Sequence, residues 1–115
     1  MPSTTSYKQG DVLLAPFPFT DQSGSKQRPA VVLSGDEYNR THPDVILAPI
    51  TGQIRSAGDE VSLVDWQTAG LLKPSVVKPV LSSFDVRLVR RTLGALTSAD
   101  LVQVRALFAR ILALP

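Results

Sequence analysis

The sequence predicts a mainly β domain, a small barrel or strongly curved sheet that is closed by one C-terminal helix. Short apolar runs alternate with turn-rich polar segments, a pattern typical of small all-β domains. The C-terminal segment instead repeats apolar residues at helical spacing. The 115 residues show no internal repeat and suffice for a single domain with one core, residues 1–115, in which residues 1–8 form a loose tail.

Three strands are predicted in the first half of the chain. Residues 12–15 form a short apolar run that is followed by proline, which cannot donate to a strand ladder. Residues 30–33 are rich in β-branched side chains, as buried strands are, and Pro29 indicates that this strand begins at a sheet edge. After one helical turn at 36–40, the apolar run 45–50 predicts the third strand.

Three further strands are predicted in the second half. Residues 60–64 alternate polar and apolar side chains, the pattern of a half-exposed strand. Residues 75–81 and 83–89 are the other two candidates, and Pro79 makes the first of them irregular or an edge strand.

A helix over residues 98–112 follows these strands. Thr97 and Asp100 form a capping box, in which the threonine hydroxyl accepts from the Asp100 amide and the carboxylate reaches back. Leu96 and Leu101 occupy the two positions of a hydrophobic staple. One apolar stripe should lie on the sheet, formed by Leu101, Val104, Phe108, Ile111 and Leu112.

The composition predicts a globular protein of the cytoplasm. Hydrophobic residues make up 43% of the chain and charged residues 19%, which is ordinary for such proteins. No apolar run approaches the roughly 20 residues that span a bilayer, and residues 1–6 show no signal peptide. The absence of cysteine excludes disulfides, thiolate metal sites and a cysteine nucleophile.

Charge is unevenly distributed along the chain. Through Asp65 there are 5 basic and 8 acidic residues, a net charge of −3, whereas from Trp66 onward there are 7 basic and 2 acidic, a net charge of +5. A basic half of this kind suits a polyanion or an acidic partner peptide, and equally a solvated surface with no partner.

The common hydrolase and nucleotide-binding motifs are absent. The sequence has no GxSxG, P-loop or GxGxxG. His42, the one histidine, lies in a Thr-His-Pro-Asp segment without metal-ligand spacing, so a solvated side chain is favoured and neither metal nor cofactor is expected. Asp59 and Glu60 are adjacent in sequence, and on a strand their side chains would point to opposite faces, which makes a poor acid–base pair.

The aromatic residues are interpreted mainly as core. Phe17 and Phe19 are spaced by two and would share one face of a strand, where packing is favoured over stacking on bases. Trp66 is likewise expected to pack.

The candidate site centres on Arg28 and Thr51. The loop 20–27 is polar and turn-rich, hence a surface loop, and it places Arg28 at the mouth of a strand. There the guanidinium can hold a phosphate with two parallel hydrogen bonds, or pair with a surface carboxylate, the commoner arrangement. The Thr51 hydroxyl can bond a phosphate oxygen or satisfy a turn. Because RNA carries its own nucleophile, the 2′-hydroxyl, such residues suffice to bind and polarise a phosphodiester.

At these residues the chain resembles the MazF/PemK family of toxin–antitoxin endoribonucleases. The resemblance covers residue 7 to the C-terminus and includes Arg-Thr-Leu-Gly at 91–94 with the helix that follows. No single motif decides it, but the order and spacing of four stretches are specific: Gly10-Asp11-Val12 with Phe17-Pro18-Phe19-Thr20, the run 28–34, the run 44–51 with Gln53, and Pro74-Ser75-Val76-Val77-Lys78 leading to Asp85.

The resemblance implies an SH3-like β-barrel with a C-terminal helix that acts as a homodimer. It implies metal-independent, sequence-specific cleavage of single-stranded RNA, leaving a 2′,3′-cyclic phosphate and a 5′-hydroxyl, with Arg28 and Thr51 catalytic. It further implies a cognate antitoxin whose acidic, disordered tail blocks the groove. RNA contacts are expected at Thr20, Lys26, Gln27, Gln53 and Ser83.

Two alternative functions stay open at the level of the sequence. Some family members carry a histidine just before the arginine and a glutamate in the loop, where this chain offers Gln27 and Asp21. The first alternative is therefore a catalytically silent barrel that binds nucleic acid or a partner peptide. The second is a structural or regulatory dimer with no role in RNA chemistry.

Overall fold

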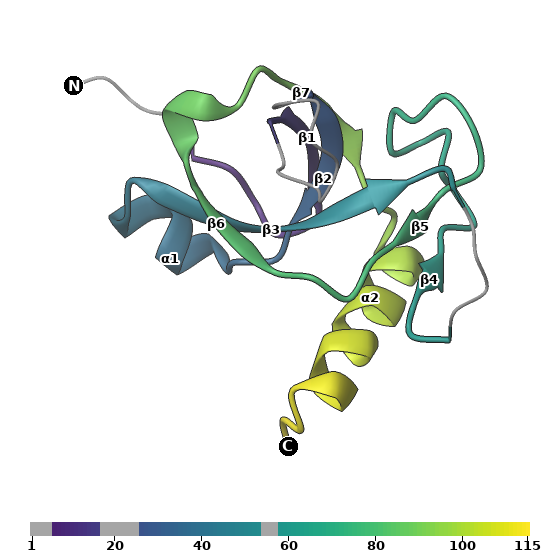
Figure 1. Ribbon diagram of the computed structural model, residues 1–115. Coiled ribbons are helices and arrows are strands. Elements are labelled where there is room, and N and C mark those ends of the chain that lie inside the picture. The colour runs from purple at the N-terminus through teal and green to yellow at the C-terminus, as the bar shows by residue number, and fades with distance from the viewer. Residues whose placement is uncertain (1–5, 17–25, 54–57) are drawn as a thin grey trace.

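The elements of the chain follow one another as short strands that end in a long helix. The computed structural model describes residues 6–16, 26–53 and 58–115 (Figure 1). Phe17, Phe19 and Thr20 lie outside these ranges. The elements in chain order are β1 (Asp11–Ala15), β2 (Arg28–Val32), α1 (Asp36–Thr41), β3 (Asp44–Thr51), β4 (Val61–Ser62), β5 (Val76–Val77), β6 (Ser82–Asp85), the 3₁₀-helix η1 (Val86–Leu88), β7 (Arg91–Ala95) and α2 (Ser98–Ile111).

Strand β3 organises the sheet because it is long enough to pair with three others. It is antiparallel to β2 along one edge, and to β6 and then β5 along the other. The hydrogen-bonded path runs β4-β5-β3-β2-β1-β7, with β6 branching from β3. Figure 1 shows this sheet curving around on itself, with α2 beneath it. The predicted class, mainly β with a C-terminal helix, is confirmed.

The barrel is not closed by strand pairing within the described residues. The path ends at β4 on one side and β7 on the other. The connection between β4 and β5 bridges part of this gap, because its backbone touches β7: a Cβ on Gly70 would lie 2.1 Å from the Leu93 carbonyl oxygen. Gly70 also has φ +83°, a backbone conformation that favours glycine.

The central strands are buried on both faces. Val12 and Val31 point into a core that α2 covers, while their neighbours Leu13 and Val32 point into a second core on the opposite face. Alternation along a strand sends successive side chains to opposite faces, and here both faces are apolar. Trp66 packs against the first core, as the sequence predicts.

Helix α2 confirms the predicted helix and corrects two of its details. The Thr97 hydroxyl accepts from the Asp100 amide at 3.3 Å, as expected of a cap. The Asp100 carboxylate, however, accepts from the backbone amides of Val64 at 3.0 Å and Asp65 at 2.8 Å, and so ties the helix to the segment after β4. The predicted apolar stripe is wrong at its end, where the curved sheet no longer reaches the helix: Leu107 is buried, whereas Ile111 and Leu112 are exposed.

The predictions for residues 75–95 needed the largest correction. Only Val76–Val77 and Ser82–Asp85 form strands, and η1 replaces the second half of the predicted strand 83–89. Strand β7 was not predicted. Its sequence Arg-Thr-Leu-Gly-Ala has no long apolar alternation, because most of its side chains are exposed or half-buried and the strand is held by backbone pairing with β1.

None of the helices in the described ranges combines the length and the apolar character that a membrane crossing requires.

Replacing Asp100 by alanine should lower the free energy of unfolding by about 1–3 kcal/mol, the usual cost of leaving buried donors unpaired. Asp100 is 2% exposed and is the acceptor for two backbone amides from another segment. Urea denaturation followed by circular dichroism measures the change, with Gln103→Ala on the exposed face of α2 as the matched control. Equal stability of the two variants would contradict the anchoring role of Asp100.

Candidate active site

A groove opens at one end of the sheet, where β1, β2 and β3 meet the connection that precedes β5. Its volume is about 430 Å³. Strands β1, β2, β3 and β7, the turn after β3 and the connection before β5 contribute to its wall. The lining residues are Leu14, Arg28, Pro29, Ile50, Thr51, Gly52, Gln53, Gly70, Leu71, Leu72, Lys73, Ser75, Arg91 and Leu93.

The pairing of β2 with β3 brings the two predicted catalytic residues to the same place. The strands are antiparallel, with Ala30 opposite Pro49 and Val31 opposite Ala48. Continuing this register past the last pair sets Arg28 opposite Thr51, at the end of the ladder. Both residues are half-buried and line the groove.

The Thr51 hydroxyl stabilises the turn that follows β3. Its oxygen accepts a hydrogen bond from the Gln53 amide at 3.1 Å, which shapes the turn after β3. A hydroxyl that accepts through its oxygen keeps its O–H free to donate elsewhere. The side chain of Gln53 is exposed and lines the same groove.

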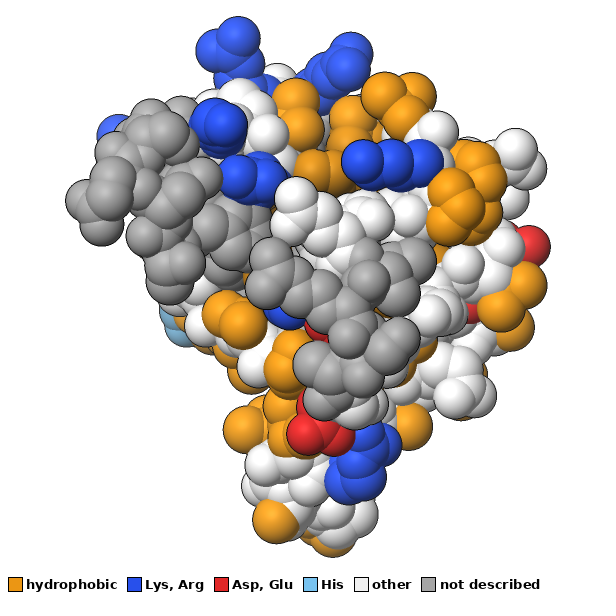
Figure 2. Space-filling model, turned by 45° about the vertical axis from the view of Figure 1, so that its right-hand side comes forward, with side chains coloured by type: hydrophobic (Ala, Val, Ile, Leu, Met, Phe, Trp, Pro, Cys, Tyr) orange, Lys and Arg blue, Asp and Glu red, His pale blue; other side chains and the backbone are white. Residues whose placement is uncertain are grey.

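The groove is lined by positive charge. Arg28, Lys73 and Arg91 belong to its wall, and the described residues that line it include neither Asp nor Glu. Figure 2 shows lysine and arginine side chains gathered in the upper part of one face, around a patch of exposed hydrophobic side chains. Such a surface attracts anions.

Lys73 and Arg91 were not singled out as site residues from the sequence. The basic second half of the chain was the one signal that pointed to them. Arg91 lies in β7 opposite Leu14 of β1, while Arg28 of β2 lies opposite Ala15 on the other side of β1. The two arginines therefore flank the end of β1.

Of the remaining predicted RNA contacts, Thr20 lies outside the described residues, and Lys26, Gln27 and Ser83 are not among the residues that line the groove. Lys26 and Gln27 are exposed and directly precede Arg28, which lines the groove. Ser83 lies on β6, opposite Ile46 of β3, and its hydroxyl donates to the Asp44 carboxylate at 2.8 Å. The structure does not bring Ser83 together with Arg28 and Thr51.

The environment of Asp44 explains its acidity. The hydroxyls of Ser83 and then Tyr38 donate to its carboxylate and hold the pKa of Asp44 below its usual value. The same hydrogen bond to Asp44 raises the pKa of the Tyr38 hydroxyl. The Tyr38 ring also stacks on His42, with ring centroids 3.8 Å apart, which accounts for the placement of the one histidine on the surface.

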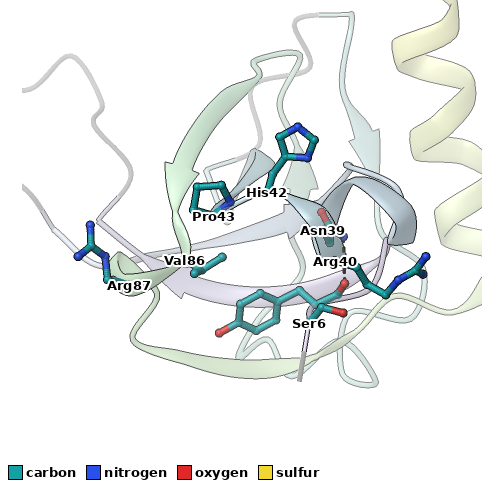
Figure 3. Close-up of a pocket in the computed structure, with 8 residues that line it drawn as sticks. Ser6, Asn39, Arg40, His42, Pro43, Val86 and Arg87 are labelled. Atoms are coloured by element: carbon teal, nitrogen blue, oxygen red, sulfur yellow. Dashed lines mark hydrogen bonds between the residues drawn. The ribbon is translucent and has the colours of Figure 1, made fainter. Parts of the chain in front are cut away.

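A second cavity, of about 520 Å³, lies near α1 and η1 (Figure 3). Arg40 and Arg87 stand on opposite sides of it, and Asn39 donates to the Tyr7 carbonyl at 2.9 Å behind it. Both arginines form ion pairs, Arg40 with Glu37 and Arg87 with Asp85. The hydrogen bonds from Arg87 lower the pKa of Asp85 to about 2. Both arginines of this cavity are therefore paired with carboxylates of the same protein.

The chain is similar to known proteins in both sequence and fold. The family model for PemK-like, MazF-like toxins of type II toxin–antitoxin systems matches residues 8–112. Among solved structures, the chain is similar to MazE–MazF from Deinococcus radiodurans (Form-III), with 27% identity and a TM-score of 0.72 over 94% of this chain and 96% of that one. No curated protein sequence matches the chain significantly.

Two further structures share the fold. The toxin MazF-mt6 from Mycobacterium tuberculosis is 23% identical, with a TM-score of 0.75 over 91% of this chain and 98% of that one. An endoribonuclease from a Mycobacterial species, solved in complex with its cognate antitoxin, is 20% identical, with a TM-score of 0.77 over 96% of this chain and 98% of that one.

Replacing Ser83 by alanine should raise the pKa of Asp44 toward its ordinary value, because the main hydrogen bond to the carboxylate is lost. A folded-state pKa that is depressed contributes stability above about pH 4, which is lost as the pH falls through the folded value. The stability gap between wild type and variant should therefore narrow below about pH 4.

Carboxyl NMR titration of Asp44 measures this pKa, with Ser82→Ala on the same strand as the control. An Asp44 pKa that does not change in Ser83→Ala would show that the hydroxyl does not serve this carboxylate.

Proposed function

The chain belongs to the PemK-like, MazF-like family of toxins of type II toxin–antitoxin systems, and from this premise we propose that it is an endoribonuclease. Its substrate is single-stranded RNA, including messenger RNA, which it cleaves at a short sequence without a metal ion. An mRNA substrate places the activity in the cytoplasm. The observation that carries the proposal is the groove in which Arg28 and Thr51 share one wall with two further cations.

The proposed reaction uses the substrate's own nucleophile. The ribose 2′-oxygen attacks phosphorus, the P–O2′ bond forms and the P–O5′ bond breaks, giving a 2′,3′-cyclic phosphate and a 5′-hydroxyl. The 2′-hydroxyl loses a proton and the departing 5′-oxygen gains one, so the step is balanced. Negative charge grows on the non-bridging phosphate oxygens along this path, and preorganised donors that meet it there lower the barrier.

Arg28 suits the role of the main phosphate donor. A guanidinium offers parallel N–H donors that match two phosphate oxygens, and it stays protonated at any relevant pH. Thr51, opposite Arg28 in the strand register, adds a hydroxyl donor whose oxygen is already fixed by the Gln53 amide. The cations of the groove supply positive charge from the protein itself, which supports a metal-independent reaction.

Recognition of a base sequence needs polar groups that reach unpaired bases. Gln53 lines the groove with an exposed amide, which can both donate to and accept from base edges. Lys26 and Gln27, which directly precede Arg28, extend the proposed path of the RNA, and Thr20 stays a prediction. Ser83, which binds Asp44 away from the groove wall, stays a prediction.

The proposed partner is a cognate antitoxin with an acidic segment. Deinococcus radiodurans MazF and the Mycobacterial endoribonuclease have both been solved with their antitoxins, which supports a partner of this kind. An acidic peptide would meet the same positive groove as RNA and so block it. We further propose a homodimer, which exposed apolar side chains near the C-terminus such as Leu112 and Leu114 support.

Arg28→Ala should reduce RNA cleavage by about 10²- to 10³-fold, the usual effect of removing one donor to the developing charge. Wild type and variant are incubated with a long unstructured RNA in the presence of EDTA. Primer extension maps the new ends, and the 3′ products are tested for a cyclic phosphate. RNA cleavage that is absent in the wild type would overturn the proposal and favour a barrel that binds nucleic acid without cutting it. Cleavage that is undiminished in Arg28→Ala would overturn the proposed role of Arg28.

Thr51→Ser should retain most of the activity, whereas Thr51→Val should lose about 10²-fold, because valine keeps the shape and removes the hydroxyl. Both variants are compared by initial rates on one RNA oligonucleotide. The serine variant controls for the turn at Gln53, since serine can still accept from that amide. Equal rates for serine and valine would remove the hydroxyl from the mechanism.

A further inference from the structure

We propose that Lys73 is a second cationic contact to the scissile phosphate, acting beside Arg28. The inference rests on the proposed ribonuclease function and assigns a further catalytic residue to it. Lys73 lies in the connection before β5, far in sequence from Arg28 and Thr51, and joins them only in the folded groove.

The carrying observation is the slot that Gly52 leaves for the lysine side chain. Gly52 directly follows Thr51 at the end of β3. A Cβ on Gly52 would lie 2.2 Å from the Lys73 Cε, 3.0 Å from its Cδ and 3.1 Å from its Nζ. The aliphatic stem of Lys73 therefore lies across the Gly52 backbone, and its ammonium group is held within a few ångströms of the residue next to Thr51.

The backbone that carries Lys73 is anchored on both sides. Ser75 is buried, its hydroxyl donates to the Lys73 carbonyl at 2.9 Å, and its own carbonyl accepts from the Leu63 amide at 3.0 Å. On the other side Leu71 is buried in the core under α2. A lysine on a fixed backbone, with its stem against a neighbour, loses less side-chain entropy on binding an anion than a free surface lysine.

The charge of Lys73 is left for an outside ligand. In the part of the chain that the structure describes, Lys73 takes part in no ion pair. Lys78, the next lysine along the chain, contrasts with it, because its ammonium binds Glu60 at 3.0 Å. The ammonium of Lys73 and the guanidinium of Arg28 thus line one groove whose described wall holds no carboxylate.

A second cation near the scissile phosphate would stabilise the transition state of the proposed reaction. The pentacovalent phosphorus carries more negative charge than the ground-state phosphodiester, and an ammonium is a compact charge with three donors. Lys73 would donate to a non-bridging oxygen of the scissile phosphate, with no proton transferred. Because the charge is greatest in the transition state, losing Lys73 should lower kcat more than it raises KM.

The first test replaces Lys73 and measures both kcat and KM. Lys73→Met should lower kcat/KM about 10- to 100-fold, the effect of one hydrogen bond between charged groups, mostly through kcat. Lys73→Arg should restore most of it. Lys8→Met makes the same change of charge at an exposed lysine outside the groove and should leave the rate unchanged. A Lys73→Met enzyme that matches Lys8→Met would overturn the inference and leave the proposed function standing.

The second test moves the lysine without removing its charge. Gly52→Ala fills the slot and displaces the flexible end of Lys73, and the Gly52 backbone lies outside the left-handed region that would strain alanine. Gly52→Ala should therefore lose activity as Lys73→Met does, and the double variant should lose no more than either single one. Additive losses in the double variant would show that the two residues act separately and would overturn the inference.

A binding measurement separates this inference from the proposed function. An RNA with a 2′-deoxy residue at the cleavage position cannot react, and its affinity is measured over a range of salt concentrations. Losing one phosphate contact should reduce the slope of log K against log salt by about 0.7 in Lys73→Met and not in Lys8→Met. If the wild type cleaves no RNA, the proposed function fails. A smaller slope in Lys73→Met would then still show that Lys73 contacts a phosphate, and an unchanged slope would show that it does not.

Discussion

The register between β2 and β3 is the constraint on which the site depends. Ala30 lies opposite Pro49, and the same register, continued two residues beyond this last pair, leads to Arg28 and Thr51 at the groove. Burial on both faces fixes it: Val31 points into one core and Val32 into the other, so a slip by one residue would exchange every side chain between the two. The core therefore holds the guanidinium and the hydroxyl at one rim.

Pairing of charges elsewhere concentrates the positive field at this rim. Three of the basic residues in the second half of the chain are bound to carboxylates, in the pairs Lys78–Glu60, Arg87–Asp85 and Arg110–Asp59. Neutralised cations contribute little to long-range attraction, whereas Lys73 in the groove takes part in no ion pair within the described part of the chain. The overall charge of +2 does not reveal this distribution, which favours the binding of anions at the groove.

Helix α2 and the connection before β5 stabilise the groove from behind. The Asp100 carboxylate binds the backbone after β4, and Leu71 inserts into the core that α2 covers. The connection is thus fixed at Leu71 and again at Ser75, while Leu72 between them is 97% exposed. Because this connection is anchored at both ends, its exposed middle can present Lys73 to the groove while the rest of the domain stays packed.

The sequence by itself determined the features that depend on neighbours along the chain: the apolar runs of β1, β2 and β3, the Thr97 cap of α2, and Arg28 at a strand mouth. Each is a local signal of periodicity, capping or turn chemistry. Only the tertiary structure decided that Asp100 ties α2 to another segment, that β7 joins the sheet, and that Lys73 enters the groove. These features depend on strand register and on close backbone approach between distant segments, which no short stretch of sequence encodes.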